Sequence, residues 1–289
     1  MNGMADLTVL DSQEYSARWK SKWFAIRHSL RGRLHRKFRR DVAFLRKFIP
    51  PGSLVVDAGS NHGRFAIEVA DLYSGESKCV VHAFEPIDYN FQVQRRVLAG
   101  RDNLTAHHCG LSDQAADFEM YIPLRPNGEL FHGGAFIANE ADFPLIAEER
   151  NDMAYVRQRV CCRTLDSVFA DSGAPVAFVK IDVEGHEFEV LRGASRILAS
   201  DRPTLLIESR GENAPLQFLT ELGFRFYDLD MREDGRWTES PREIQLGIGR
   251  AGKHHDVLCW HPEGLTSYGS GQGQAPDFST SFSRTRFGT

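Results

Sequence analysis

The chain has 289 residues and a net charge of −4 at neutral pH, enough for one large domain with appended segments. Its composition is typical of a soluble globular protein, and the slightly acidic balance argues against a dedicated nucleic-acid-binding protein. Its five cysteines form neither a disulfide framework nor a Cys-x-x-Cys metal motif, and no apolar run has the roughly 20 residues that span a bilayer. Because no secretory signal stands at the N-terminus, we expect a cytoplasmic protein.

Residues 1–48 form a polar and then strongly basic segment. Apolar residues recur at intervals of three and four between Trp19 and Leu45, while the other face carries Lys and Arg, which predicts an amphipathic helix. Three interpretations of this helix compete. In the first, the helix packs on the rest of the protein or in a homodimer. In the second, residues 16–40 dock peripherally on an anionic membrane surface at the inner membrane face. The third, contact with nucleic acid, is disfavoured by the net charge, so we expect no nucleic-acid partner.

Residues 49–263 alternate apolar, strand-like runs with helical patterns. We predict strands at residues 54–57, 79–84, 104–109, 176–183, 204–208, 224–229 and 256–260, and helices at 64–73, 88–99, 186–199 and 214–222. Such alternation predicts βαβ units and a parallel sheet. No helix separates the last two strands, so we expect them to pair as an antiparallel hairpin at one edge. The fold class is therefore α/β: a Rossmann-like, mostly parallel seven-stranded sheet with helices on both faces.

Two stretches depart from this alternation. Residues 121–159 are rich in loop-forming Pro, Gly and Asn, and we expect a loop-rich insertion that is either a substrate-facing lid or a surface excursion. Residues 264–289 are rich in Gly, Ser, Thr and Gln with few aliphatic residues, which predicts a disordered tail.

The most informative motif follows the first predicted strand of residues 49–263. This strand ends at Asp57, and a turn with Gly59 and Gly63 leads into a helix. The spacing differs from the Gly-x-Gly-x-x-Gly of dehydrogenases, but it also brings a nucleotide-like ligand against backbone N–H groups. The next strand ends at Glu85, where a carboxylate can accept hydrogen bonds from both ribose hydroxyls. Together these two motifs indicate a site for S-adenosylmethionine.

A second motif runs from Lys180 to Ala194, where a buried strand ends near Asp182 and Gly185 allows a sharp turn. Ligands of open α/β sheets bind outside the carboxyl ends of the strands, so this loop should face the same crevice as Gly59. There Asp182 would lie close to a cationic methyl donor, where a carboxylate is electrostatically favoured.

Four motifs, in this order, resemble the FkbM family of S-adenosylmethionine-dependent methyltransferases. They are Asp57-Ala-Gly-Ser-Asn-His-Gly63, Phe84-Glu-Pro86, Thr164-Leu-Asp166 and Lys180-Ile-Asp-Val-Glu-Gly-His-Glu187. The resemblance spans roughly residues 50 to 262 and implies the class I methyltransferase architecture. It also implies methylation of a hydroxyl group on a glycan, a glycolipid or a related small-molecule natural product.

The resemblance also implies roles for single residues. By it, Asp57, Gly59, Asn61 and Gly63 contact the methionine part of the donor, Glu85 binds the ribose, and Asp182 lies near the methyl group. An adenine contact is expected from the stretch that contains Ser112 and Asp113.

A sugar hydroxyl is a poor nucleophile, so a general base should assist the transfer. The candidates are Glu184, His186 and Glu208. His186 has the most suitable pKa because imidazole titrates near neutrality, whereas Glu184 also fits a structural role as a tether of the loop. Although Asp182, Glu184 and His186 alternate, we do not expect them to converge. Since the His-Glu-x-x-His pattern is also missing, we predict no metal site.

Two other functions remain as rivals. A nucleic-acid methyltransferase would use the basic helix to contact phosphates. A catalytically inactive S-adenosylmethionine-binding interaction module would keep the fold without the reaction, but Asp57, Gly59, Gly63 and Glu85 are intact.

Overall fold

The computed structural model describes residues 8–18, 44–73, 75–150, 154–209, 214–229, 242–244 and 255–264. The basic helix predicted over residues 16–40 and the tail predicted over residues 264–289 therefore lie almost entirely outside the described residues. Within the described part of the chain, no helix is long and apolar enough to cross a membrane.

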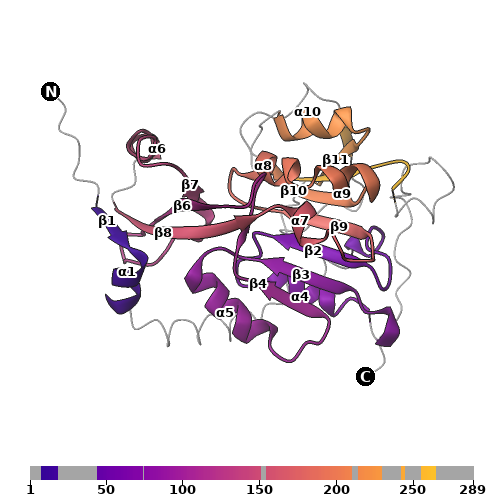
Figure 1. Ribbon diagram of the computed structural model, residues 1–289, viewed down its shortest axis with the longest axis horizontal. Coiled ribbons are helices and arrows are strands. Elements are labelled where there is room, and N and C mark those ends of the chain that lie inside the picture. The colour runs from indigo at the N-terminus through magenta and orange to yellow at the C-terminus, as the bar shows by residue number, and fades with distance from the viewer. Residues whose placement is uncertain are drawn as a thin grey trace.

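The centre of the molecule is a large mixed sheet (Figure 1), in which eight strands are paired among the described residues. Their spatial order is β12-β11-β13-β10-β9-β2-β3-β4. In that order the strands are Arg242–Ile244, Arg225–Leu229, His255–Trp260, Thr204–Ser209, Val176–Ile181, Leu54–Ala58, Val80–Phe84 and Leu104–His107. The five strands from β10 to β4 run parallel to one another, which confirms the predicted mostly parallel sheet.

The predicted antiparallel pair is present but lies differently from a simple edge hairpin. Strand β13 pairs antiparallel with β11 on one side and with β10 on the other. Its residues Val257 to Trp260 are fully buried, as expected for a strand with neighbours on both sides. The short strand β12 pairs outside β11 and adds an eighth strand to the seven predicted from the sequence.

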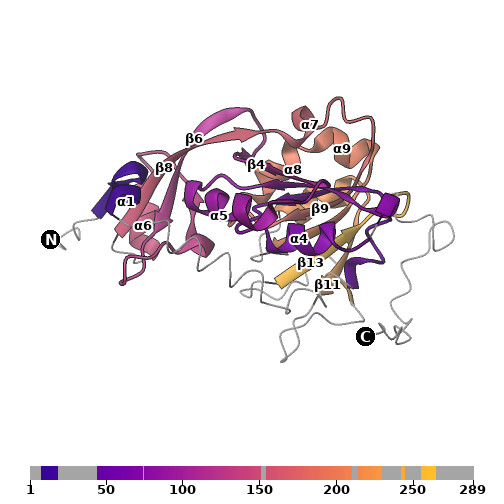
Figure 2. The same cartoon turned by 90° about the horizontal axis from the view of Figure 1, so that it is seen from below.

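Helices cover both faces of this sheet, as predicted (Figure 2). Val55 of β2 belongs to the core beneath α4 (Arg64–Ala70) and α5 (Asp88–Leu98). Its neighbours Val56 and Ala58 belong to the opposite core, because successive side chains of a strand point to opposite faces. That core is covered by α7 (Leu165–Val168), α8 (Glu187–Arg192), α9 (Ser195–Ser200) and α10 (Ala214–Glu221).

The prediction of a single helix over residues 186–199 is wrong, because the chain forms two helices there, α8 and α9. The helical ladder is interrupted where the carbonyl of Gly193 accepts a hydrogen bond from the backbone N–H of Asp166. The carboxylate of Asp166 in turn accepts from the N–H groups of Arg196 and Ile197, in the first turn of α9. Asp166 of the Thr164-Leu-Asp166 motif therefore caps the start of α9.

A second, smaller sheet lies beside the large one and replaces the predicted loop-rich insertion over residues 121–159. Its strands are β1 (Thr8–Asp11), β8 (Ala154–Arg163), β6 (Ala116–Pro123), β7 (Phe136–Ile137) and β5 (Gly110–Leu111). Short helices α1 (Ser12–Arg18), α6 (Phe143–Arg150), η1 (Gly75–Ser77) and η2 (His132–Gly134) complete the described elements. Because β6 and β8 pair antiparallel over eight residue pairs, the predicted boundaries at 121 and 159 fall inside strands. Strand β1 joins β8, so part of the predicted N-terminal segment belongs to this sheet.

Candidate functional site

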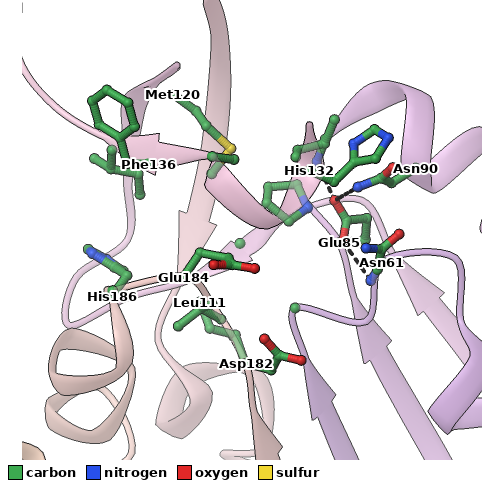
Figure 3. Close-up of a pocket in the computed structure, with 18 of the residues that line it drawn as sticks. Asn61, Glu85, Asn90, Leu111, Met120, His132, Phe136, Asp182, Glu184 and His186 are labelled. Atoms are coloured by element: carbon green, nitrogen blue, oxygen red, sulfur yellow. Dashed lines mark hydrogen bonds between the residues drawn. The ribbon is translucent and has the colours of Figure 1, made fainter. Parts of the chain in front are cut away.

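One cavity of about 350 Å³ lies between the two sheets. Its floor is formed by the carboxyl ends of β2, β3 and β9 and the loops that follow them, and its opposite wall comes from β6, β7, η2 and α6. Figure 3 shows Met120 and Phe136 on one side, Asp182 on the other and Glu184 between them. The cavity therefore lies where open α/β sheets bind their ligands.

Glu85 is a buried acidic residue of this cavity, held by three hydrogen-bond donors. Its side chain is 3% exposed. One carboxylate oxygen accepts hydrogen bonds from the backbone N–H of Ile87 at 2.9 Å and from the side-chain amide of Asn90 at 3.1 Å. The other accepts from the backbone N–H of Asn61 at 2.8 Å. Burial raises the pKa of Glu85 to about 7, although these three donors act in the opposite direction.

The loop after β2 approaches this carboxylate because its backbone is left-handed at three positions. Gly59, Asn61 and Gly63 have φ angles of 75°, 50° and 76°, a region that favours glycine and tolerates asparagine. The two glycines serve different purposes. A Cβ on Gly59 would lie 1.8 Å from the carbonyl oxygen of Asp182, so glycine allows the ends of β2 and β9 to meet. A Cβ on Gly63 would press on Leu98 of α5 at 2.9 Å.

Asp57 differs from the other predicted donor contacts because it lies beneath the cavity. Its side chain is fully buried, and one of its oxygens lies 3.9 Å from the ammonium group of Lys180. The same ammonium group lies 2.7 Å from a carboxylate oxygen of Asp182. Burial raises the pKa of Asp57 to about 6, while Lys180 lowers it. Lys180 thus joins the first glycine loop to the end of β9.

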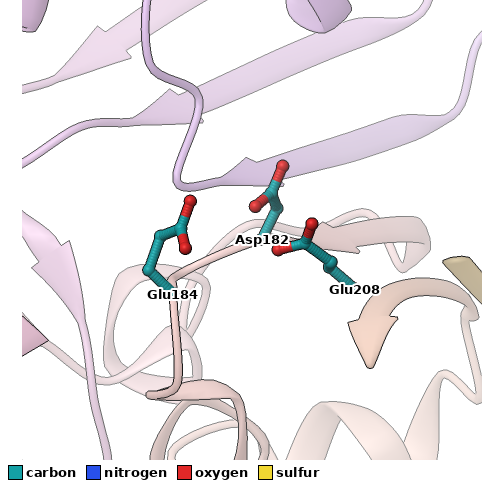
Figure 4. Close-up of side chains that lie close together, drawn as sticks. All are labelled: Asp182, Glu184 and Glu208. Atoms are coloured by element: carbon teal, nitrogen blue, oxygen red, sulfur yellow. The ribbon is translucent and has the colours of Figure 1, made fainter. Parts of the chain in front are cut away.

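Asp182, Glu184 and Glu208 bring their carboxylates together at this end of the sheet (Figure 4). One oxygen from each residue lies within 4.8 Å of the others. We expected Asp182, Glu184 and His186 not to converge, but Asp182 and Glu184 do, and Glu208 completes the group in place of His186. Burial first, and then the charge of Asp182, raise the pKa of Glu208 to about 7. Such a group can hold a shared proton or a cation, because like charges at this distance disfavour full ionisation.

Ser112 and His186 occupy the other end of the cavity floor. The hydroxyl of Ser112 is 2.9 Å from Nε2 of His186, and Ser112 is completely buried. A Cβ on Gly193 would lie 2.0 Å from the carbonyl oxygen of Ser112, so glycine is needed where α8 meets this loop. Asp113 forms an ion pair with Arg192 at 3.3 Å. Of these residues, only His186 lines the cavity.

The structure thus brings Gly59, Asn61, Glu85, Asp182, Glu184 and His186 to one cavity, while Asp57, Gly63, Ser112, Asp113 and Glu208 support it from behind or beside. Three features were missed in the sequence. Lys180 belongs to a motif named above but was given no role. Asn90, in the first turn of α5, was not considered. The wall from the second sheet was missed because residues 121–159 were interpreted as loops.

The comparisons with known proteins agree with this geometry. A family model described as "Methyltransferase FkbM domain" matches residues 57–226. The curated methyltransferase sdnD of Sordaria araneosa is 30% identical over 168 residues, which are 50% of this chain and 61% of that protein. This chain therefore spans less than two thirds of that relative's length.

Solved methyltransferases are more distant. A methyltransferase FkbM from Methylobacillus flagellatus KT is 16% identical with a TM-score of 0.45, covering 72% of this chain and 44% of that chain. Aeropyrum pernix fibrillarin, in complex with natively bound S-adenosyl-L-methionine, is 13% identical with a TM-score of 0.37, covering 76% and 74% of the two chains.

Proposed function

The chain belongs to the FkbM methyltransferase family, and we propose that it transfers the methyl group of S-adenosylmethionine to a hydroxyl group of a carbohydrate, a glycolipid or a related natural product. The observation that carries this proposal is Glu85, a buried carboxylate held at the end of β3 against the glycine loop. An ionised carboxylate can accept about four hydrogen bonds, and three N–H groups donate to Glu85. One acceptor site therefore stays available for a ribose hydroxyl.

The surroundings of Glu85 fit the rest of such a donor. Gly59 and Asp182 line the same cavity. When bound, S-adenosylmethionine supplies an electrophilic methyl group on a positively charged sulfur. Carboxylates close to this charge favour binding, and Lys180 holds Asp182 in place. The protein then acts mainly by alignment, which contributes up to roughly 7–11 kcal/mol in well-oriented reactions.

Glu184 is the candidate base that the geometry favours most. It lines the cavity, and a Cβ on Gly133 of η2 would lie 3.3 Å from one of its carboxylate oxygens. Its φ angle of 61° is a backbone conformation that costs energy for a non-glycine residue. From there its carboxylate can accept the proton that the acceptor hydroxyl loses as the new O–C bond forms. Glu208 lies behind Asp182 and has a suitable pKa of about 7 because of its burial. His186 is engaged by Ser112.

The experiment that tests this function incubates the protein with methyl-labelled S-adenosylmethionine and fractionated extract of its source cells. Glu85→Ala serves as the blank, since it should bind the donor poorly. Label in a glycan, glycolipid or small-molecule fraction, absent from the blank, is the expected result. Label confined to nuclease-sensitive or protease-sensitive material would contradict the proposal and favour a nucleic-acid or protein methyltransferase. No label in any fraction, with donor binding intact, would favour an inactive binding module.

A further inference from the structure

The cavity wall opposite the strand ends is mostly apolar. It is formed by Met120 of β6, Phe136 and Ile137 of β7, Ile146 of α6, the neighbouring Ala135 and one polar residue, His132 of η2. Behind it, Tyr121 stacks on Phe136 and on Phe143, whose ring centroid lies 3.9 Å away, and Tyr155 meets Phe136 and Phe143 edge-on. Such an apolar wall favours an apolar ligand surface, since burying such surface is favourable by roughly 25 cal/mol per Å².

The charges around the cavity have one sign. Glu85, Asp182 and Glu184 line it, and among its described lining residues there is no Lys or Arg. Lys180, whose ammonium group is paired with Asp182 and Asp57, does not line the cavity. Arg and Lys are the usual charge-assisted donors to a phosphate or carboxylate. An anionic acceptor would therefore lie beside three carboxylates, with no Arg or Lys of the described lining to offset their charge.

We propose that the acceptor is uncharged and carries an apolar skeleton beside its reactive hydroxyl, which it buries against Met120, Phe136 and Ile146. This inference rests on the proposed function, because the donor must occupy the floor near Glu85 and Gly59 for the apolar wall to be left to the acceptor. Nucleotide sugars, sugar phosphates and diphosphate-linked lipids fit the described lining less well, because their phosphates would lie beside Glu85, Asp182 and Glu184. Neutral glycosides of apolar alcohols and hydroxylated natural products fit.

Binding measurements with simple probes test this assignment without the true acceptor. We would titrate the protein, saturated with S-adenosylhomocysteine, with methyl, hexyl and octyl β-glucoside below their micelle concentrations, and with glucose 6-phosphate and UDP-glucose. The expected result is an affinity that rises by about tenfold or more from the methyl to the octyl glucoside, since each buried methylene adds to binding. The two phosphorylated probes should bind no more tightly than methyl glucoside. Equal affinities across the glucosides, or preferred binding of either phosphorylated probe, would overturn the inference.

Two neighbouring residues of α6 provide a matched pair of variants. Ile146 lines the cavity, whereas Leu145 is 65% exposed and does not. Ile146→Asp should weaken octyl glucoside binding by about tenfold or more, and Leu145→Asp should leave it unchanged. Because Ile146 also packs against the aromatic residues behind the wall, Ile146→Ser is the second variant if Ile146→Asp does not fold. Equal losses in the Leu145 and Ile146 variants would show non-specific detergent binding and contradict the assignment.

Titration with S-adenosylhomocysteine alone separates the two levels of failure. If it does not bind, the proposed function fails, and the acceptor inference fails with it. If it binds with similar affinity in the wild type and the Ile146 variants, the donor site is intact, and the glucoside series then decides the acceptor class alone.

Discussion

The hydroxyl oxygen of Ser112 lies 2.9 Å from Nε2 of His186, so one hydrogen bond joins a predicted donor contact to a predicted base. The other ring nitrogen, Nδ1, lies 3.5 Å from the carboxylate of Glu189. Burial lowers the pKa of His186, although Glu189 and Asp113 act in the opposite direction. Both nitrogens of the ring are therefore engaged by neighbouring side chains, and the imidazole ties the loop after β5 to the start of α8.

This geometry predicts that His186 positions the loop and does not remove the acceptor proton. With an acceptor identified by the labelling experiment, His186→Gln should lower kcat by less than about tenfold, whereas loss of a general base costs roughly 10²–10⁴-fold. Glu184→Gln should show the larger loss and leave donor affinity nearly unchanged. The measurement is kcat at saturating donor across pH 6 to 9. A larger loss in His186→Gln than in Glu184→Gln would restore histidine as the base.

Removing the carboxylate of Glu85 should weaken donor binding. We expect Glu85→Ala to reduce the affinity for S-adenosylmethionine by about 2 kcal/mol, or roughly 30-fold, since hydrogen bonds to a charged group contribute about 1.5–3 kcal/mol each. Isothermal titration calorimetry measures this change. Glu76→Ala, in the exposed helix η1, is the control and should bind as the wild type does. Unchanged affinity in Glu85→Ala would remove this residue from the ribose site.

Donor binding should release protons near pH 6.5. Burial raises the pKa of Asp57 to about 6 and the pKa values of Glu85 and Glu208 to about 7. In the free protein these groups hold protons that the unfolded chain has lost, so their contribution to stability falls as pH rises from about 4 to 7. A cationic donor favours their ionised forms, so affinity should rise between pH 6 and 8.

Calorimetry in phosphate and in imidazole buffer at pH 6.5 measures this proton release directly, because the two buffers differ in ionisation enthalpy. Glu85→Gln is the informative variant, since it removes one of the three carboxylates and should release fewer protons. Net proton uptake, or an affinity independent of pH in the wild type, would contradict the electrostatic role of these groups.

The sequence predicted the large sheet well because each of its elements carries a local signal. The strand before Asp57 is a continuous apolar run, as buried parallel strands are, and the glycine loop and Glu85 follow strands at positions that the topology brings together. The same reasoning failed at residues 121–159, where Pro and Gly were taken as evidence for loops. The alternation of buried Val156, Val160 and Cys162 with exposed or half-buried Arg157, Arg159 and Cys161 is a strand signal that was available and overlooked.

Other features of the site could not be read from the chain. The approach of Glu208 to Asp182 depends on the pairing of β10 with β9 and on side-chain orientations that no local pattern specifies. Likewise, the break between α8 and α9 depends on Asp166, some thirty residues earlier, whose carboxylate accepts from the N–H of Arg196 at 2.8 Å. Both are tertiary contacts that override local helix and strand preference.

Gly59 and Gly75 offer a comparison that isolates the close approach of β2 and β9. Both have a positive φ, 75° and 62°, so alanine at either position should cost about 1–2 kcal/mol of backbone strain. A Cβ on Gly75 would meet nothing within 4 Å, whereas one on Gly59 would lie 1.8 Å from the carbonyl oxygen of Asp182. We therefore expect Gly59→Ala to lower the free energy of unfolding by about 1–3 kcal/mol more than Gly75→Ala does.

Because relief of the clash moves Asp182, Gly59→Ala should also abolish binding of S-adenosylhomocysteine, while Gly75→Ala should preserve it. Urea unfolding and calorimetry of the two variants provide the measurement, and equal losses in both would mean that the loop relaxes without disturbing the donor site.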